Sequence, residues 1–420
     1  ALSWDSFRYL SSARALFTSD MGEWYEWIRE PVYPLLLRGT IGLLGNSDIW
    51  IVAVQATIVV VGVSILCHAW WETRPALRRT ALVLIVVNPI VIGFTGWVGQ
   101  QSVLLGLLCL TGGWLAAVTG PPRMRVSVLI VASATLGAAI VLTSALYLPV
   151  VVAAGLYAWL TPRWKYVTVR RQRDDPRSKR TASIAAISLV LAATVSLGSW
   201  WVYKAAVIAD AENAHGGVLW IWDFDGRDPD EVSSRLVPKI LAFLMLGDEE
   251  FAVEIPEVAI YGALSEATSD RCGETFDADP PSVAYTAGFI ELSCRPAWST
   301  AIHRALGDIG LAGYQFAMLA LFLSIVPGLI LIPQVRVFAI LTIAFLSPYL
   351  IGGLGISRYA LPLYPFAITV VLIGLDTTTS WAAALLSRPS TPEERGTSRH
   401  NADRNPSNTE QAATTVDHDS

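Results

Sequence analysis

The chain has 420 residues, of which 53% are hydrophobic and only 15% are charged, and its formal net charge is −5. This balance excludes an ordinary soluble domain and predicts an integral membrane protein. The chain holds 4 Cys and 5 His, and none of them has metal-ligand spacing. We therefore predict no protein-held metal from the sequence. A Walker-type phosphate-binding loop is also missing from the sequence, so ATP-driven chemistry is not expected.

Apolar runs long enough to cross a bilayer, about 20 residues each, recur along the chain. They predict an all-α polytopic helix bundle of about nine spans. We place these spans at Ile49 to Trp70, Thr80 to Phe94, Trp97 to Val118, Val126 to Leu142, Tyr147 to Leu160, Ala182 to Tyr203, Ile309 to Ile332, Val337 to Leu350 and Ala360 to Leu375. Because the chain begins with Ala and no signal peptide precedes its polar opening segment, we also expect a further span upstream.

Basic residues follow the first, third, fifth and seventh predicted spans, which gives a consistent alternation of sides. Positively charged loops face the cytoplasm, so the opening segment, the long polar loop and the turn at Ser357 all fall on the opposite side. The sequence therefore predicts a multi-pass cell-membrane protein with its active face extracytoplasmic. The basic residues are Arg74, Arg78, Arg79, Arg123, Arg125, Arg163, Lys165, Arg170, Arg171, Arg173, Arg177, Lys179, Arg180 and Arg336.

Five regions follow from this layout. Residues 1–47 form the first extracytoplasmic loop with short surface helices, 48–205 hold six spans, 206–308 form an extracytoplasmic loop domain, 309–376 hold three spans, and 377–420 form a disordered cytoplasmic tail. The loop domain carries 18 Asp or Glu against 6 Lys or Arg between Ala206 and Leu306. Cys272 and Cys294 both lie in it, so we predict that they form a disulfide if the loop faces an oxidising compartment.

The opening loop carries the motif D-S-x-x-Y-x-x-x-A from Asp5, followed after about twenty residues by P-x-Y-P-L-L-L from Pro31. This pattern, set before a series of apolar spans, resembles the first external loop of the GT-C superfamily, the polytopic glycosyltransferases that use polyprenyl-phosphate sugars, with a mannosyltransferase-like layout. The resemblance implies an inverting enzyme that moves a sugar from a polyprenyl-phosphate donor to a lipid, glycan or protein acceptor outside the membrane. It implies no cofactor, although a divalent metal is compatible with it.

Three residues of the opening loop are candidates for the site. The resemblance makes Asp5 the general base, whereas the structural alternative is that Asp5 favours the N-terminal turn of a surface helix. Tyr9, four residues on, either binds a ligand or packs at the membrane interface. Glu30 either assists the base or binds a metal or a sugar hydroxyl, or it is simply solvated, which is the interpretation we favour.

The turn G-I-S-R-Y-A-L-P before the last span supplies Arg358 and Tyr359. The resemblance puts an Arg of an R-Y-x-x-P pattern near the lipid phosphate, and snorkelling of Arg358 to the interface is the alternative. One departure stands out, because many relatives have an acidic residue where this chain has Gln100 and Gln101. An amide neither acts as a base nor binds a cation strongly, so an inactive scaffold of the same fold remains a second hypothesis.

A membrane transporter or lipid flippase is the alternative from another class. Transporters usually carry internal repeats and ionisable residues at mid-membrane depth, and the predicted spans have almost none of either. The basic segment from Arg163 to Arg180 predicts contact with anionic lipid, and no nucleic-acid partner.

Overall fold

The computed structural model describes residues 9–10, 12–14, 16, 30–45, 48–95, 99–119, 125–161, 176–207, 297–352 and 357–386. Within these ranges the regular structure is helical and no strand occurs, which confirms for this part of the chain that the fold is all-α. The helices are α2 (Val32–Leu44), α3 (Asp48–Trp70), α4 (Pro75–Val86), α5 (Pro89–Thr95), α6 (Gln100–Thr119), α7 (Val126–Thr143), η3 (Ala145–Tyr147), α8 (Leu148–Leu160), α9 (Pro176–Val207), α16 (Ala297–Ile330), α17 (Pro333–Gly352), η6 (Ser357–Leu363) and α18 (Tyr364–Leu386).

Six of these helices contain stretches long and apolar enough to cross a membrane. The stretches are Ile49–Trp70, Gln100–Thr119, Val126–Thr143, Lys179–Lys204, Ile309–Ile330 and Ala360–Ala383. Each overlaps one of the predicted spans, and side chains such as Val60, Leu191 and Leu323 leave their outer faces apolar and exposed. An exposed apolar helix surface is what a lipid environment requires, because hydrocarbon cannot hydrogen-bond to polar groups.

The remaining three predicted spans are helical as well, but none of them is among the six stretches that are long and apolar enough to cross a membrane. The run from Thr80 to Phe94 is divided into α4 and α5, and the run from Tyr147 to Leu160 forms the 13-residue helix α8 with η3 before it. The run from Val337 to Leu350 lies within α17. The division of α4 from α5 falls at Asn88-Pro89, because Pro89 has no N–H for the helix ladder and its ring clashes with the preceding turn.

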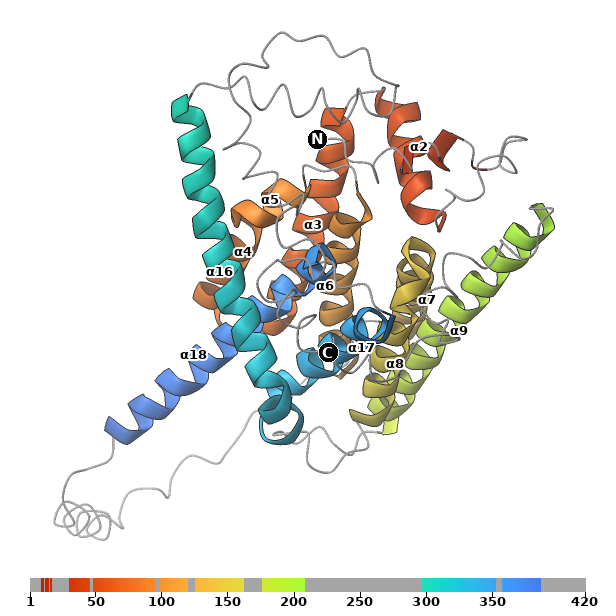
Figure 1. The fold of residues 1–420 in the computed structure, drawn as a ribbon. Coiled ribbons are helices and arrows are strands. Elements are labelled where there is room, and N and C mark those ends of the chain that lie inside the picture. The colour runs from red at the N-terminus through yellow and green to blue at the C-terminus, as the bar shows by residue number, and fades with distance from the viewer. Residues whose placement is uncertain are drawn as a thin grey trace, which may run out of the picture. The chain divides into compact units, whose positions relative to one another are not determined.

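Small residues bring the long helices close together. A Cβ atom on Gly62 in α3 would lie 2.5 Å from the carbonyl oxygen of Gly106 in α6, so only glycine fits at this crossing. Gly137 in α7 has the same relation to the Leu189 carbonyl of α9. Close backbone approach through small residues is the usual way that helices associate in membranes. Figure 1 shows the result for α7, α8 and α9, which run side by side.

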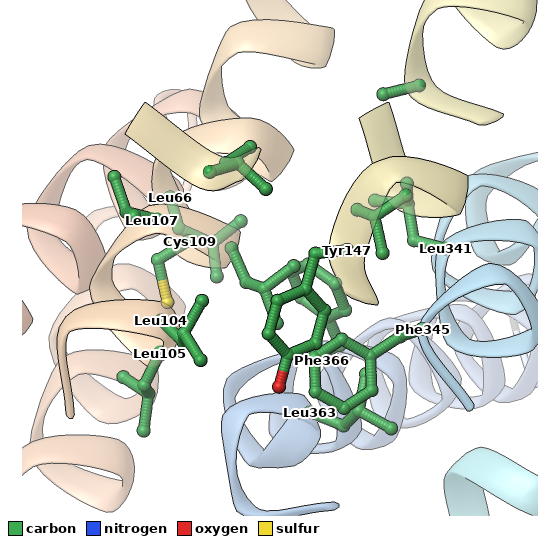
Figure 2. Packing of buried hydrophobic residues seen from close by; sticks show 14 of the residues in the cluster. Leu66, Leu104, Leu105, Leu107, Cys109, Tyr147, Leu341, Phe345, Leu363 and Phe366 are labelled. Carbon is green, nitrogen blue, oxygen red and sulfur yellow. The ribbon is translucent and has the colours of Figure 1, made fainter. Parts of the chain in front are cut away.

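Aromatic rings pack between α3, η3, α17 and the start of α18. The ring of Tyr147 in η3 stacks on Phe345 with 4.8 Å between centroids, and both are drawn in Figure 2. Phe338 contacts Phe366 at 5.2 Å and Trp70 at 4.7 Å between centroids. These contacts connect α3, η3, α17 and α18 through one buried core.

The last helix is longer than the sequence predicts. α18 continues to Leu386, ten residues into the segment 377–420 that we expected to be disordered. Ala and Leu after Trp381 are strong helix formers, and the Thr378 and Thr379 hydroxyls donate to carbonyls one turn earlier, so they satisfy themselves within the helix. The chain divides into two compact units, 1–373 and 374–420, and this extension belongs to the second.

Candidate functional site

The end of the opening segment is attached to the bundle by a short series of buried hydrogen bonds. Tyr33, in the first turn of α2, donates from its hydroxyl to Oε1 of Gln55 in α3 at 2.6 Å. Gln55 in turn donates from Nε2 to the carbonyl of Thr95, the last residue of α5, at 2.9 Å. Tyr9 packs edge-on against Tyr33, with ring centroids 4.8 Å apart. This series joins residues separated by 22 and 40 positions, so it fixes α2 against α3 and α5.

Burial decides the charge state of the phenol in this series. Tyr33 is fully buried, and desolvation raises its pKa well above the ordinary value of 10.0. The hydroxyl therefore keeps its proton throughout the physiological range and acts as a permanent donor to Gln55. Since the proton is held so firmly, Tyr33 is suited to positioning rather than to proton transfer.

A second attachment is made by the carboxylate of Glu30. Its Oε1 accepts a hydrogen bond from the backbone N–H of Ala145, the first residue of η3, at 3.2 Å. The half-buried Glu30 thus satisfies a donor at a helix start, where backbone N–H groups lack partners within the helix. Our expectation that Glu30 is simply solvated is wrong, because the carboxylate is bonded to the protein. Arg38 of α2 adds a third tie, by donating to the carbonyl of Leu16.

The corner that Glu30 contacts is itself bonded to the end of α17. The hydroxyls of Tyr147 and Tyr349 lie 2.7 Å apart and share a hydrogen bond. Tyr349 stands in the last turn of α17, a few residues before η6 begins at Ser357. The opening segment, the corner between α7 and α8, and the end of α17 are therefore joined by two hydrogen bonds, although they are distant in sequence.

The side chains of Gln100 and Gln101 lie at the N-terminal end of α6, which packs against α5. Oε1 of Gln100 is inaccessible to solvent and has no hydrogen-bond partner. Gln101 is 7% exposed, and its Oε1 lies over Gly99, 2.7 Å from where a Cβ atom on that glycine would stand. Buried polar atoms in proteins are nearly always paired, so an unpaired one invites an explanation.

The other predicted site residues divide into two groups. Asp5, Cys272 and Cys294 lie outside the described residues, so the base assignment and the disulfide stay predictions. Arg358 and Tyr359 belong to η6, which packs beside α6, and their side chains are outside the described part of the structure. The structure brings Tyr9 and Tyr33 together and ties Glu30 to η3. No group of three or more His, Cys, Asp or Glu side chains gathers as a metal site among the residues described.

Several of these residues were not identified from the sequence. Tyr33 lies inside the P-x-Y-P-L-L-L motif, and Gln55 is a polar residue within an apolar span, which is a signal that could have been used. Tyr147 and Tyr349 carry no such signal, since aromatic residues are common in membrane helices. No family model matches the chain, and no curated protein or solved structure is significantly similar to it.

Proposed function

We propose that the chain is a glycosyltransferase of the inverting type, which transfers a sugar from a polyprenyl-phosphate donor to an acceptor on the extracytoplasmic side of the membrane. The observation that carries the proposal is the set of hydrogen bonds joining the opening segment to the rest of the bundle. One hydrogen bond joins Glu30 to the N–H of Ala145, and a second joins the hydroxyls of Tyr147 and Tyr349. Glu30 follows Asp5 in the chain, and Tyr349 precedes Arg358. These bonds join Glu30 to the helix that precedes Arg358 in the chain, which supports one site built from the two segments.

Transfer of a sugar to a hydroxyl requires a base for the acceptor proton and positive charge for the departing phosphate. In the proposed enzyme Asp5 takes the proton and Arg358 binds the donor phosphate through charge-assisted hydrogen bonds. The C1–O bond to the phosphate breaks as the acceptor oxygen bonds to C1, and the lipid phosphate leaves with the bonding electrons. Tyr359 and Tyr9 belong to the same proposed site.

The proposed topology has more membrane spans than the six long apolar stretches described above. It has nine spans. In addition to the six long stretches, α4 and α5 together form one span, α8 forms another and α17 a third. With this number of spans, α2 and η3 lie on the extracytoplasmic side. The basic clusters at Arg78, which follows α3, and at Arg125, which precedes α7, support this orientation. They lie at the ends of α3 and α7 that are away from α2 and η3. A multi-pass location in the cell membrane follows from it.

A transporter would use the break between α4 and α5, because discontinuous membrane helices often form substrate sites. In this chain the polar groups at the break are used by the protein itself. Nδ2 of Asn88 donates to the Gly310 carbonyl and to the Tyr364 hydroxyl, and its Oδ1 accepts from the Ile90 N–H. The break therefore has the features of a structural joint, which favours the enzyme over the transporter.

The test is transfer of radiolabelled sugar from polyprenyl-phosphate mannose, and in parallel from polyprenyl-phosphate glucose, to extracted membrane lipids in proteoliposomes. Asp5→Asn should lower the rate by roughly 10² to 10⁴, which is the usual worth of a general base. Arg358→Ala should also weaken donor binding, because its contact is to a group charged in the ground state. Asp376→Asn and Arg79→Ala are the matched controls. An unaltered rate in Asp5→Asn would refute the assignment of the base.

A further inference from the structure

The exposed surface of α3 changes from apolar to polar at the last turn of the helix. Val61, Ile65 and His68 are all exposed, and their spacing of four and then three residues places them on one face of α3. Val61 and Ile65 suit contact with hydrocarbon, whereas His68 does not. An α-helix rises about 1.5 Å per residue, so His68 lies roughly 10 Å beyond Val61 along the helix. This face therefore passes from a lipid-compatible surface to a polar end within two turns.

The neighbouring helix α4 shows the same change and contacts α3 at the polar end. Arg78 lies near the start of α4, and the exposed apolar side chains of Val83 and Leu84 follow it in the next turns. Nη1 of Arg78 lies 3.2 Å from Nδ1 of His68. Because a guanidinium has only donors, Nδ1 accepts this hydrogen bond and the ring proton of His68 is on Nε2. Two donor groups from two helices thus meet where both apolar surfaces end.

The segment around this contact is rich in positive charge. Residues 68–79 include three Arg and one acidic residue, Glu72. The first turn of α4 has no acidic residue, although the helix dipole favours negative charge there. Arg74 and Arg78 are four residues apart, and like charges at this spacing on a helix repel each other. A negatively charged group from outside the chain therefore stabilises this corner.

We infer that the corner between the end of α3 and the start of α4 binds an anionic phospholipid. The headgroup phosphate accepts hydrogen bonds from the Arg78 guanidinium and from Nε2 of His68, and an acyl chain lies along Val61 and Ile65. Basic groups beside membrane helices recognise anionic headgroups in this way. A soluble phosphate would need the donors alone, whereas the apolar surface that leads to them fits a ligand with chains. The inference goes beyond the proposed function and does not depend on it.

The experiment maps bound lipid by photo-crosslinking. The purified full chain is placed in phosphatidylcholine nanodiscs with a trace of phosphatidylglycerol, or of phosphatidylcholine, that carries a diazirine in one acyl chain. Peptide mass spectrometry compares the two probes at Val61 and Ile65 and, as an internal reference, at Leu323, an exposed apolar residue of α16. At Val61 and Ile65 we expect phosphatidylglycerol to exceed phosphatidylcholine by about five-fold, the usual effect of one basic residue on an anionic lipid. At Leu323 the two probes should react equally.

Four variants test the two donors. Arg78→Gln should remove the preference for phosphatidylglycerol, whereas Arg78→Lys keeps the charge and should retain most of it. His68→Phe should lower the preference about two-fold, because it removes one neutral hydrogen bond. Arg125→Gln removes the same charge from an exposed position before α7 and should leave the preference at α3 unchanged.

Three results would overturn the inference. The first is an equal preference at Ile65 and Leu323 in the unaltered chain, which would mean that the corner does not select the lipid. The second is an unaltered preference in Arg78→Gln. The third is loss of the preference when soluble glycerol 3-phosphate is added, because the ligand would then be a free phosphate rather than a lipid.

Discussion

Replacing Tyr33 by Phe tests whether the opening segment is held by the buried series that ends at Thr95. The change removes one hydroxyl and keeps the ring that packs against Tyr9. The hydroxyl donates to Gln55 Oε1 at 2.6 Å, and Tyr33 and Gln55 are both at 0% exposure. Phe therefore removes the phenolic donor from a buried amide oxygen, which costs about 1–3 kcal/mol. We expect a cost in the upper half of this range. The hydrogen bond from Gln55 Nε2 to the Thr95 carbonyl holds the amide in place, so its oxygen cannot rotate towards solvent.

The free energy of unfolding is measured by titration with SDS in mixed micelles, with helical circular dichroism as the signal. A double-mutant cycle with Gln55→Leu should give a coupling of 1 kcal/mol or more, approximately, since the two groups share one bond. Thr57→Val in the same helix is the control. Its exposed hydroxyl bonds only to the carbonyl of Ala53, so its loss should cost under about 0.5 kcal/mol. If Tyr33→Phe costs no more than Thr57→Val, or if the cycle is additive, the reasoning is refuted.

The pH dependence of the same pair has a definite sign. Burial raises the pKa of Tyr33 in the folded chain above the ordinary 10.0 of the unfolded chain. Folding therefore disfavours the phenolate, so the contribution of Tyr33 is fully present below pH 10 and is lost as the pH rises above 10. The stability difference between the unaltered chain and Tyr33→Phe should be constant from about pH 6 to pH 9 and should shrink at higher pH. A difference that grows above pH 10 would contradict the assignment.

Three further predictions use the same unfolding titration or a simple companion assay. Asn88→Leu should cost about 2–3 kcal/mol because it removes three hydrogen bonds of one buried side chain, to the Gly310 carbonyl, the Tyr364 hydroxyl and the Ile90 N–H, whereas Tyr364→Phe should cost about 1 kcal/mol because Asn88 keeps two of these bonds; equal costs would refute this division. Gly137→Val should destabilise by 2 kcal/mol or more, approximately, by forcing α7 from α9, while Gly198→Ala, with nothing within 4 Å, should be neutral or slightly stabilising. Glu30→Leu should expose the opening segment to trypsin, whereas Glu30→Gln, which keeps an acceptor oxygen, should protect it; equal cleavage of both would argue against the tie to η3.

Hydropathy predicted the helices well, and it predicted their interruptions poorly. An apolar run reports the free energy of moving a segment out of water, which is a local quantity, so Ile49 to Trp70 and Val126 to Leu142 were found nearly to the residue. The division at Asn88 depends instead on Pro89 and on partners 222 and 276 positions away, Gly310 and Tyr364. A joint of this kind can form only because those partners exist, and a window of 20 residues does not contain them.

In the candidate site, too, the residues could be predicted from the sequence but their hydrogen-bond partners could not. The acidic positions could be found from their residue type and from the resemblance, yet the partner of Glu30 is a backbone N–H at Ala145, which has no signature in the sequence. Tyr33 was visible as part of a motif, but its role depends on Gln55 and on burial. Polar residues within apolar runs were the usable signal, because a membrane helix keeps an amide only where the amide has a partner or a task.

The contrast between Asn88 and Gln100 shows why the residue type of an amide does not predict its role. Asn88 has a protein partner for its oxygen and two for its nitrogen, so the fold accounts for it. Gln100, at the start of α6, has a solvent-shielded oxygen that receives no hydrogen bond. Both amides lie beside apolar runs in the sequence, and they differ only in the partners that distant parts of the chain supply, so a local pattern does not distinguish them.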